Sequence, residues 1–181
     1  MIYTYKLEID DYQTHLLYTI SKSSSAVKTR AKIRLMISIF LVILAFISFG
    51  NHSIGQGLYL LFLSVLAFYL MPKYTRWSYR STYLKHVKKF YKDRISEPTT
   101  FEIIGDSIHV SDSHGESTLS ALDIDEINEL ANYCFLKTKS GQSIILPMYS
   151  IESSENLILE LTDFADKFDI PWNDEVNWIW K

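Results

Sequence analysis

Cysteine, glycine and proline are scarce in this chain of 181 residues, which has one cysteine, six glycines and four prolines. The single thiol, that of Cys134, excludes an internal disulfide, and no Cys and His residues stand at the spacing of a zinc site. No phosphate-binding glycine loop, His-Glu-x-x-His motif or Gly-x-Ser-x-Gly motif occurs. We therefore expect no enzyme activity, no catalytic residue, no metal and no cofactor. One unpaired cysteine agrees with soluble parts that lie in a reducing cytosol.

Charge is absent from two apolar blocks. Residues 35–49 contain no charged residue, and the block extended to residues 33–50 makes about 27 Å of helix. The second block, residues 58–71, is apolar except for Ser64 and becomes longer if residues 54–57 join it. Neither block has the polar stripe of an amphipathic helix. We predict a two-helix transmembrane hairpin over residues 33–72 with a tight turn at 51–57; the alternative is a buried hairpin of a soluble domain.

Lysine and arginine are absent from the predicted turn but frequent on both outer sides. Of the 18 basic residues, 13 lie between Lys22 and Arg94. Because short cytoplasmic flanks retain Lys and Arg, we predict a cell-membrane protein with two spans, both termini in the cytoplasm and residues 51–57 outside. Residues 1–12 are polar and acidic, so we expect no cleavable signal peptide.

Basic and aromatic side chains flank the two blocks, and we predict that they contact the anionic inner leaflet at the membrane interface. These residues are Lys28, Arg30, Lys32, Arg34, Lys73, Tyr74, Arg76, Trp77 and Arg80. Residues 73–96 carry Trp77, Leu84, Val87 and Tyr91 at helical spacing. We expect them to form a separate basic amphipathic helix that leaves the membrane.

The net charge of −3 conceals a segregation: −2 for residues 1–21, +12 for residues 22–94 and −13 for residues 95–181. The densest acidic run departs from the spacing of a calcium loop. We predict that it forms a solvated or partner-facing surface together with tryptophans of the tail at 172–181. The residues are Asp123, Asp125, Glu126, Glu129, Trp178 and Trp180. For the tail as a whole, packing on its own domain is the favoured interpretation, and docking at the membrane or on a partner protein is the alternative; we expect no nucleic-acid partner.

The remaining segments predict short strands and two helices. Within residues 1–32, an alternating strand precedes a helix that Asp10 caps, and a flexible Ser-rich, basic linker follows. Within residues 97–171, five or six antiparallel strands are separated by hairpin turns. A closing helix with Ser153 as its N-cap follows, with Leu157 and Leu161 on its buried face.

The order of these parts resembles the YcxB-like family of small bacterial membrane proteins. The resemblance rests on the strand "YCFL" at 133–136, "IILP" at 144–147 and the Ser/Glu start of the last helix. It implies an α+β membrane protein, in which a transmembrane helical hairpin accompanies a small antiparallel β half-barrel. That half-barrel is similar to a bacterial pleckstrin-homology (PH)-like domain and is closed by the C-terminal helix. The resemblance implies a fold and a location, but no mechanism.

Three weaker features have structural explanations as alternatives to functional ones. His109, Asp112 and His114 are either metal ligands or residues of an exposed hairpin turn. Cys134 is either a nucleophile or a small buried hydrophobe. Small residues on each apolar block, Ser38, Ala45 and Ser48 and then Gly57, Ser64 and Ala67, favour packing within the hairpin over a homo-oligomer. We expect a membrane-anchored cytoplasmic binding or regulatory module with an unidentified protein partner; the alternative is an accessory component of a transport assembly.

Overall fold

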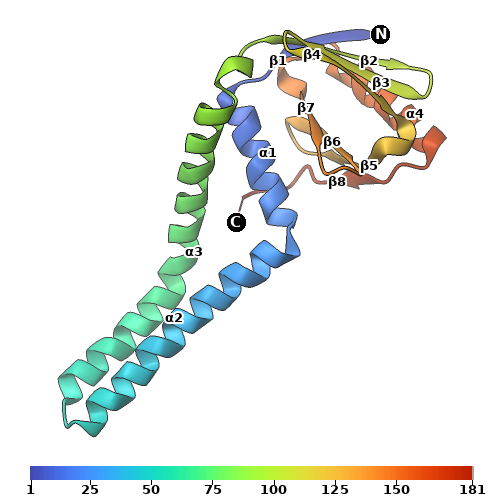
Figure 1. The fold of residues 1–181 in the computed structure, drawn as a ribbon. Coiled ribbons are helices and arrows are strands. Elements are labelled where there is room, and N and C mark those ends of the chain that lie inside the picture. The colour runs from blue at the N-terminus through green and yellow to red at the C-terminus, as the bar shows by residue number, and fades with distance from the viewer. Residues whose placement is uncertain (181) are drawn as a thin grey trace. The chain divides into compact units, whose positions relative to one another are not determined.

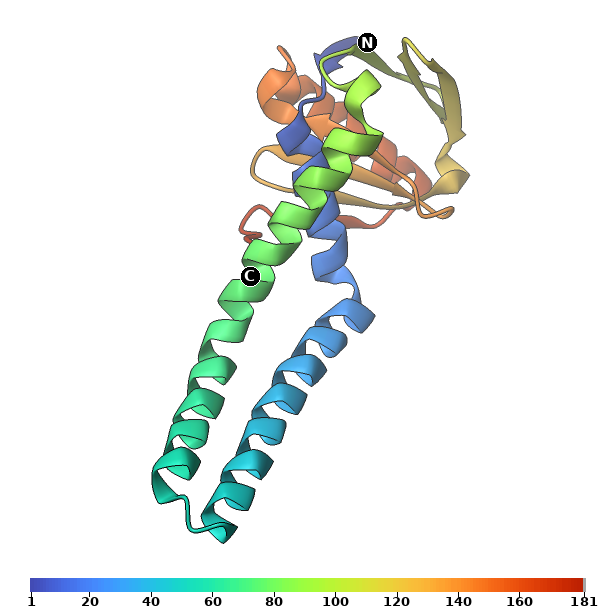
Figure 2. The same ribbon diagram turned by 60° about the vertical axis from the view of Figure 1, so that its left-hand side comes forward.

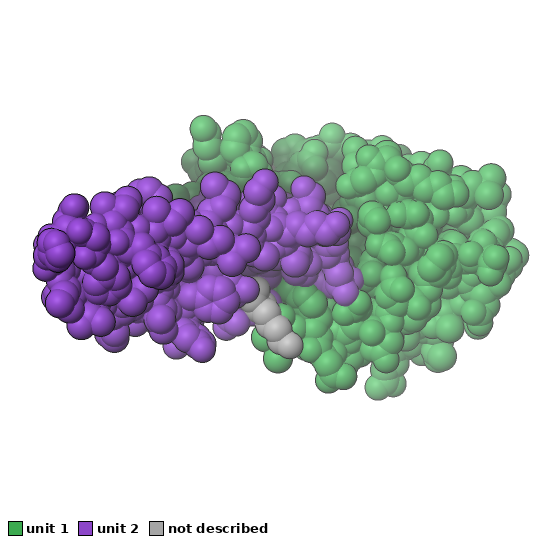
Figure 3. Space-filling view, turned by 90° about the horizontal axis from the view of Figure 1, so that it is seen from below, with its two compact units in different colours: residues 1–15, 84–179 green, residues 16–83, 180–181 purple. Residues whose placement is uncertain are grey.

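The computed structural model describes residues 1–180, apart from the side chain of Asp93. The chain divides into two compact units, which Figure 3 shows in different colours. The first, called the sheet unit below, consists of Met1–His15 and Leu84–Ile179. The second, called the hairpin unit, consists of Leu16–Tyr83 together with Trp180. Residues from both ends of the chain therefore share the sheet unit.

The first sheet of the sheet unit begins with the N-terminal strand. Strands β1 (Ile2–Lys6), β2 (Pro98–Ile104), β3 (Ser107–Asp112) and β4 (Gly115–Ser120) lie in this order and are antiparallel (Figure 1). In β1, the buried rings of Tyr3 and Tyr5 alternate with exposed side chains. Tyr3 is paired with Phe101 of β2, which is fully buried. This alternation of buried and exposed residues is what a strand with one face on the core requires.

The second sheet contains a parallel pair that the sequence did not predict. Its order is β7 (Ser143–Pro147), β6 (Tyr133–Thr138), β5 (Ile124–Glu129) and β8 (Trp172–Asp174). Strand β8 lies in the segment that was predicted to be the tail. It runs parallel to β5, whereas all strands were expected to be antiparallel. Backbone hydrogen bonds join Ile127 N to Pro171 O at 2.9 Å and Glu175 N to Glu129 O at 2.7 Å. The two sheets do not form a closed barrel among the described residues.

Helix α4 (Ser154–Phe168) lies between β7 and β8 in the sequence, and a helix was predicted at this place. Its buried residues are Leu157, Leu161, Phe164 and Ala165, at the spacing of one helical face. Burial of each leucine side chain contributes about 2 kcal/mol to stability. Ser153 stands at the predicted N-cap position, but its side chain makes no capping hydrogen bond. The apolar face, rather than the cap, therefore accounts for the helix.

Helix α1 (Ile9–Lys22) begins one residue before the expected cap. The Asp11 carboxylate, and not that of Asp10, accepts a hydrogen bond from the backbone N–H of Glu8, at 2.7 Å. The predicted role of Asp10 was therefore wrong. Asp10 and Asp11 are adjacent and have the same side chain, so the sequence alone does not distinguish them. The position at which the helix begins decides which carboxylate can reach the unpaired backbone N–H of the first turn.

The two apolar blocks lie in helices α2 (Ser24–Gly50) and α3 (Ile54–Phe90), and both are longer than expected. Figure 2 shows the hairpin that they form. The Ser-rich segment is not a flexible linker, because Ser23 is the N-cap of α2 and accepts a hydrogen bond from Ala26 N at 3.3 Å. Helix α3 continues through Pro72 into the basic segment, so the separate helix predicted from residue 73 is the second half of α3. The 3-10 turn Lys92–Arg94 follows α3.

Small residues allow the two helices of the hairpin to approach closely. Ser38, Ala45 and Ser48 are the buried residues of α2. The Ser64 hydroxyl on α3 donates to the carbonyl oxygen of Ser38 at 3.0 Å. A Cβ atom at Gly57 would overlap the ring of Phe49. The predicted packing of small residues within the hairpin is therefore confirmed.

Candidate functional sites

Most apolar side chains of α2 and α3 are exposed. In the most apolar 18-residue window of each helix, 11% of the residues are buried. Phe46 on α2 is 67% exposed and Phe62 on α3 is 63% exposed. An apolar helix in the core of a soluble protein would instead be mostly buried, and exposed apolar surface of this extent marks a contact with lipid or another protein. Both helices are long and apolar enough to cross a membrane.

The predicted interface residues all lie in the hairpin unit, where α2 begins and where α3 leaves its apolar block. Two of the aromatic side chains are well exposed, Tyr74 at 60% and Trp77 at 67%, and their ring centroids lie 6.2 Å apart. The exposed basic residues are Lys28, Lys32, Lys73, Arg76 and Arg80. Arg30 and Arg34 differ from these because they are partly buried.

The two partly buried arginines stack on aromatic rings of the hairpin unit. The Arg30 guanidinium lies 5.6 Å from the ring centroid of Tyr79 and 5.2 Å from that of Trp180. Tyr79 and Trp180 themselves meet edge to face at 6.0 Å. The Arg34 guanidinium lies 4.6 Å from the Phe68 ring centroid. Such contacts hold a guanidinium in one orientation.

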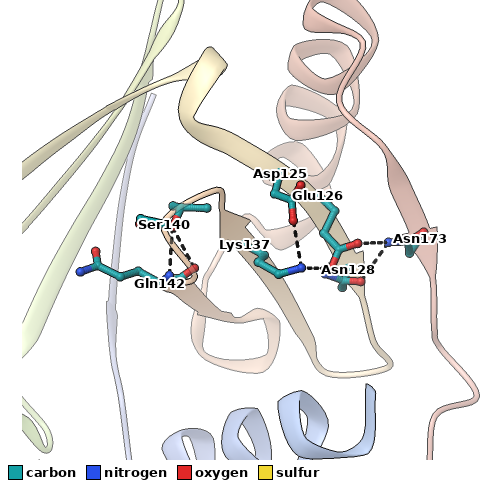
Figure 4. Close-up of polar contacts among 8 residues, drawn as sticks. Asp125, Glu126, Asn128, Lys137, Ser140, Gln142 and Asn173 are labelled. Atoms are coloured by element: carbon teal, nitrogen blue, oxygen red, sulfur yellow. Dashed lines mark hydrogen bonds and ion pairs between the residues drawn. The ribbon is translucent and has the colours of Figure 1, made fainter. Parts of the chain in front are cut away.

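The acidic run of β5 is joined to neighbouring strands (Figure 4). Lys137 on β6 contacts Asp125 at 2.9 Å and Glu126 at 3.1 Å. Hydrogen bonds to Asp125, and then to Glu126, raise the pKa of Lys137. The Asn173 side-chain amide on β8 donates to Glu126 at 3.2 Å and to the Asn128 side-chain oxygen at 3.0 Å. This network therefore connects β5 with β6 on one side and with β8 on the other.

The other residues of the predicted partner surface also make intramolecular contacts. Asp123 accepts a hydrogen bond from Ser120 N at 3.1 Å, and Glu129 accepts one from the Trp172 indole at 3.0 Å. Trp178 is partly buried in the sheet unit, and its backbone N–H donates to Glu175 O at 2.8 Å. Trp180 belongs to the hairpin unit, where its ring contacts those described above. The four acidic residues and Trp178 therefore belong to the sheet unit, whereas Trp180 belongs to the hairpin unit.

A buried carboxylate that sequence reasoning missed lies in the sheet unit. Asp11 is fully buried, and the Tyr149 hydroxyl donates to it at 2.8 Å. Burial and this hydrogen bond raise the pKa of Tyr149. Burial, and then the charge of Asp11, raise the pKa of Tyr133 to about 12. Both hydroxyl groups therefore remain protonated at neutral pH. The sequence does not identify this site, because Tyr149 lies 138 residues after Asp11.

The remaining candidates occupy ordinary structural positions. The Asp112 carboxylate accepts hydrogen bonds from the backbone N–H groups of His114 and Gly115, at 2.8 and 3.0 Å, as in a polar turn. His109 contacts the Thr118 hydroxyl at 3.1 Å. Within the described part of the chain, no group of three or more His, Cys, Asp or Glu residues could hold a metal ion. Cys134 is fully buried, burial raises the pKa of its thiol, and the prediction of a buried hydrophobe is confirmed.

No family model, curated protein or solved structure matches this chain.

Proposed function

We propose that this protein is a membrane-anchored cytoplasmic binding or regulatory module, in which α2 and α3 cross the bilayer. The observation that carries the proposal is the pairing of β1 with β2, in which Ile2 is the partner of Glu102. The whole apolar hairpin lies between these two strands in the sequence. Because both strands belong to one sheet, the chain returns to the side from which it entered. Two crossings satisfy this requirement, and a single crossing does not.

The charge distribution supports a cytoplasmic location for the sheet unit. Basic residues stand on both flanks of the hairpin, and none lies in residues 51–57. Short flanks that are rich in Lys and Arg remain in the cytoplasm. Both termini would then be cytoplasmic. Residues 95–181, with a net charge of −13, would be repelled by the anionic inner leaflet and would face the cytosol. A basic surface of a protein partner is complementary to this charge.

The arrangement of the strands supports the PH-like part of the proposal. Strands β1 to β4 form one antiparallel sheet, β5 to β7 follow as consecutive antiparallel strands of the second, and α4 comes next. This order agrees with the YcxB-like resemblance of the sequence. Asp106 lies in the turn that joins β2 to β3, and Asp112 and Glu116 flank the turn that joins β3 to β4; these carboxylates would repel a phosphoinositide head group. The proposal therefore assigns the sheet unit a protein partner rather than a lipid ligand.

Fractionation of cells that express the full chain tests the anchoring. Membranes are washed first with high salt and then at alkaline pH, which remove proteins held by charge or by partner proteins. We expect the chain to remain in the washed membranes and to be released by detergent. Recovery of most of the chain in the alkaline supernatant would contradict the proposal.

A further inference from the structure

A cavity of about 260 Å³ lies between α2 and α3 in the hairpin unit. Three guanidinium-bearing residues line it, namely Arg30 and Arg34 from α2 and Arg76 from α3. Its apolar wall includes Val27, Ala31 and Met71. The volume exceeds that of a few waters, at about 30 Å³ each, but it is below that of a cavity for a drug-sized ligand. It suits a small polar group that carries an apolar extension.

No carboxylate lies nearby in the sequence that could neutralise the positive charge of this cavity. No Asp or Glu occurs between Asp11 and Asp93, so the hairpin unit contains no acidic side chain. Three arginines on facing helices repel one another unless an anion lies between them. The cavity therefore favours an anionic ligand.

One donor on a residue that lines the cavity is buried without a partner. The Nε atom of Arg34 makes no hydrogen bond and is inaccessible to solvent. A buried N–H group without an acceptor is costly, and such groups are rare in folded proteins. The Phe68 ring at 4.6 Å holds the Arg34 guanidinium in place, and the rings of Tyr79 and Trp180 do the same for Arg30. The guanidinium groups of Arg30 and Arg34 are thus oriented before any ligand binds.

We propose that this cavity binds a phosphate group, and that the group belongs to an anionic phospholipid of the inner leaflet. Arginine forks match phosphate oxygens in charge and geometry. The lipid is favoured over free phosphate by position. Arg34 directly precedes the apolar block 35–49, and Met71 ends the block 58–71, so the cavity lies where head groups meet hydrocarbon. The inference rests on the proposed function, since a lipid reaches the site only from the bilayer.

Native mass spectrometry of the detergent-solubilised full chain tests the site, with phosphatidylglycerol as the anionic probe and phosphatidylcholine as the zwitterionic one. We expect the native chain to retain phosphatidylglycerol in preference. Arg34→Gln removes one fork and should weaken its binding about tenfold, as expected for the loss of a charge-assisted hydrogen bond. Lys139→Gln removes one positive charge from an exposed position in the sheet unit and should change the affinity by less than about twofold. Equal losses in the two variants would contradict the site.

Further arms separate the remaining explanations. Arg76→Gln, at an exposed position on the other helix, should also weaken binding and provides a second test if Arg34→Gln misfolds, as judged by circular dichroism. Inorganic phosphate should not displace the lipid; displacement at comparable concentration would overturn the lipid assignment in favour of free phosphate. Loss of lipid selectivity from a chain that stays in alkaline-washed membranes would refute only this inference. Loss of the native chain from those membranes would refute the proposed function.

Discussion

Replacing Phe62 by arginine separates a lipid-facing helix from a solvent-facing one. Phe62 is 63% exposed on α3, within residues 58–71, the shorter apolar block. In water, an exchange at an exposed position changes stability by less than about 0.5 kcal/mol. At the centre of a membrane helix, Phe favours insertion and Arg opposes it, so the exchange costs about 3 to 4 kcal/mol. That difference corresponds to a factor of about 100 or more in the insertion equilibrium.

Leu159 of α4 provides the matched control, because it is 64% exposed but belongs to the sheet unit. Full chains with Phe62→Arg or Leu159→Arg are expressed at equal levels, and the amount of each in alkaline-washed membranes is measured by immunoblot. We expect Phe62→Arg to lose most of its membrane-integrated fraction and Leu159→Arg to retain it. Equal recovery of the two variants would refute the reasoning that α3 faces lipid.

Three further predictions concern stability, each followed by thermal melting of the full chain in mild detergent. Leu161→Ala should lower the free energy of unfolding by about 3 kcal/mol because the side chain is fully buried, whereas Leu159→Ala should lower it by less than about 0.5 kcal/mol. Equal melting points would mean that α4 does not cover the core. Gly57→Leu should loosen the hairpin because its Cβ would overlap a facing aromatic ring, whereas Gly55→Leu meets nothing within 4 Å and should be tolerated. Burial lowers the pKa of His15 to about 4. Below pH about 6.5, His15 therefore becomes protonated in the unfolded chain but stays neutral in the folded chain. The free energy of unfolding should fall by up to about 3 kcal/mol as the pH drops to about 4. His15→Gln should remove that part of the pH dependence, and an unchanged profile would contradict the assignment.

Long uniform patterns in the sequence predicted most of the elements. The apolar blocks of α2 and α3 and the alternating strands of the two sheets are such patterns, and the structure has a helix or strand at each of them. The extent of α3 was not predictable in this way. Pro72 and the change to basic residues suggested a break, but Lys, Arg and Leu are good helix formers, and one proline did not end the helix.

Features that depend on distant contacts could not be read from the sequence. Strand β8 has only three residues, and its pairing is set by bonds to β5, which lies on the other side of α4 in the sequence. The buried role of Asp11 depends on Tyr149, 138 residues later. The basic residues of the hairpin unit were predicted as a group, but their sequence spacing gave no means of separating Arg34, with its unpaired Nε atom, from the exposed Lys28.

Cysteine accessibility in intact cells tests the two-span topology with a cytoplasmic sheet unit. Asn51, in the turn between α2 and α3, and Ser113, in the sheet unit, are both exposed, and each is replaced by cysteine. The native chain is the unlabelled control, because Cys134 is fully buried. With a membrane-impermeant thiol reagent, we expect labelling of Asn51→Cys in intact cells and of Ser113→Cys only after permeabilisation. Labelling of Ser113→Cys in intact cells, with Asn51→Cys protected, would show that the sheet unit lies outside the cell and would contradict the proposed topology.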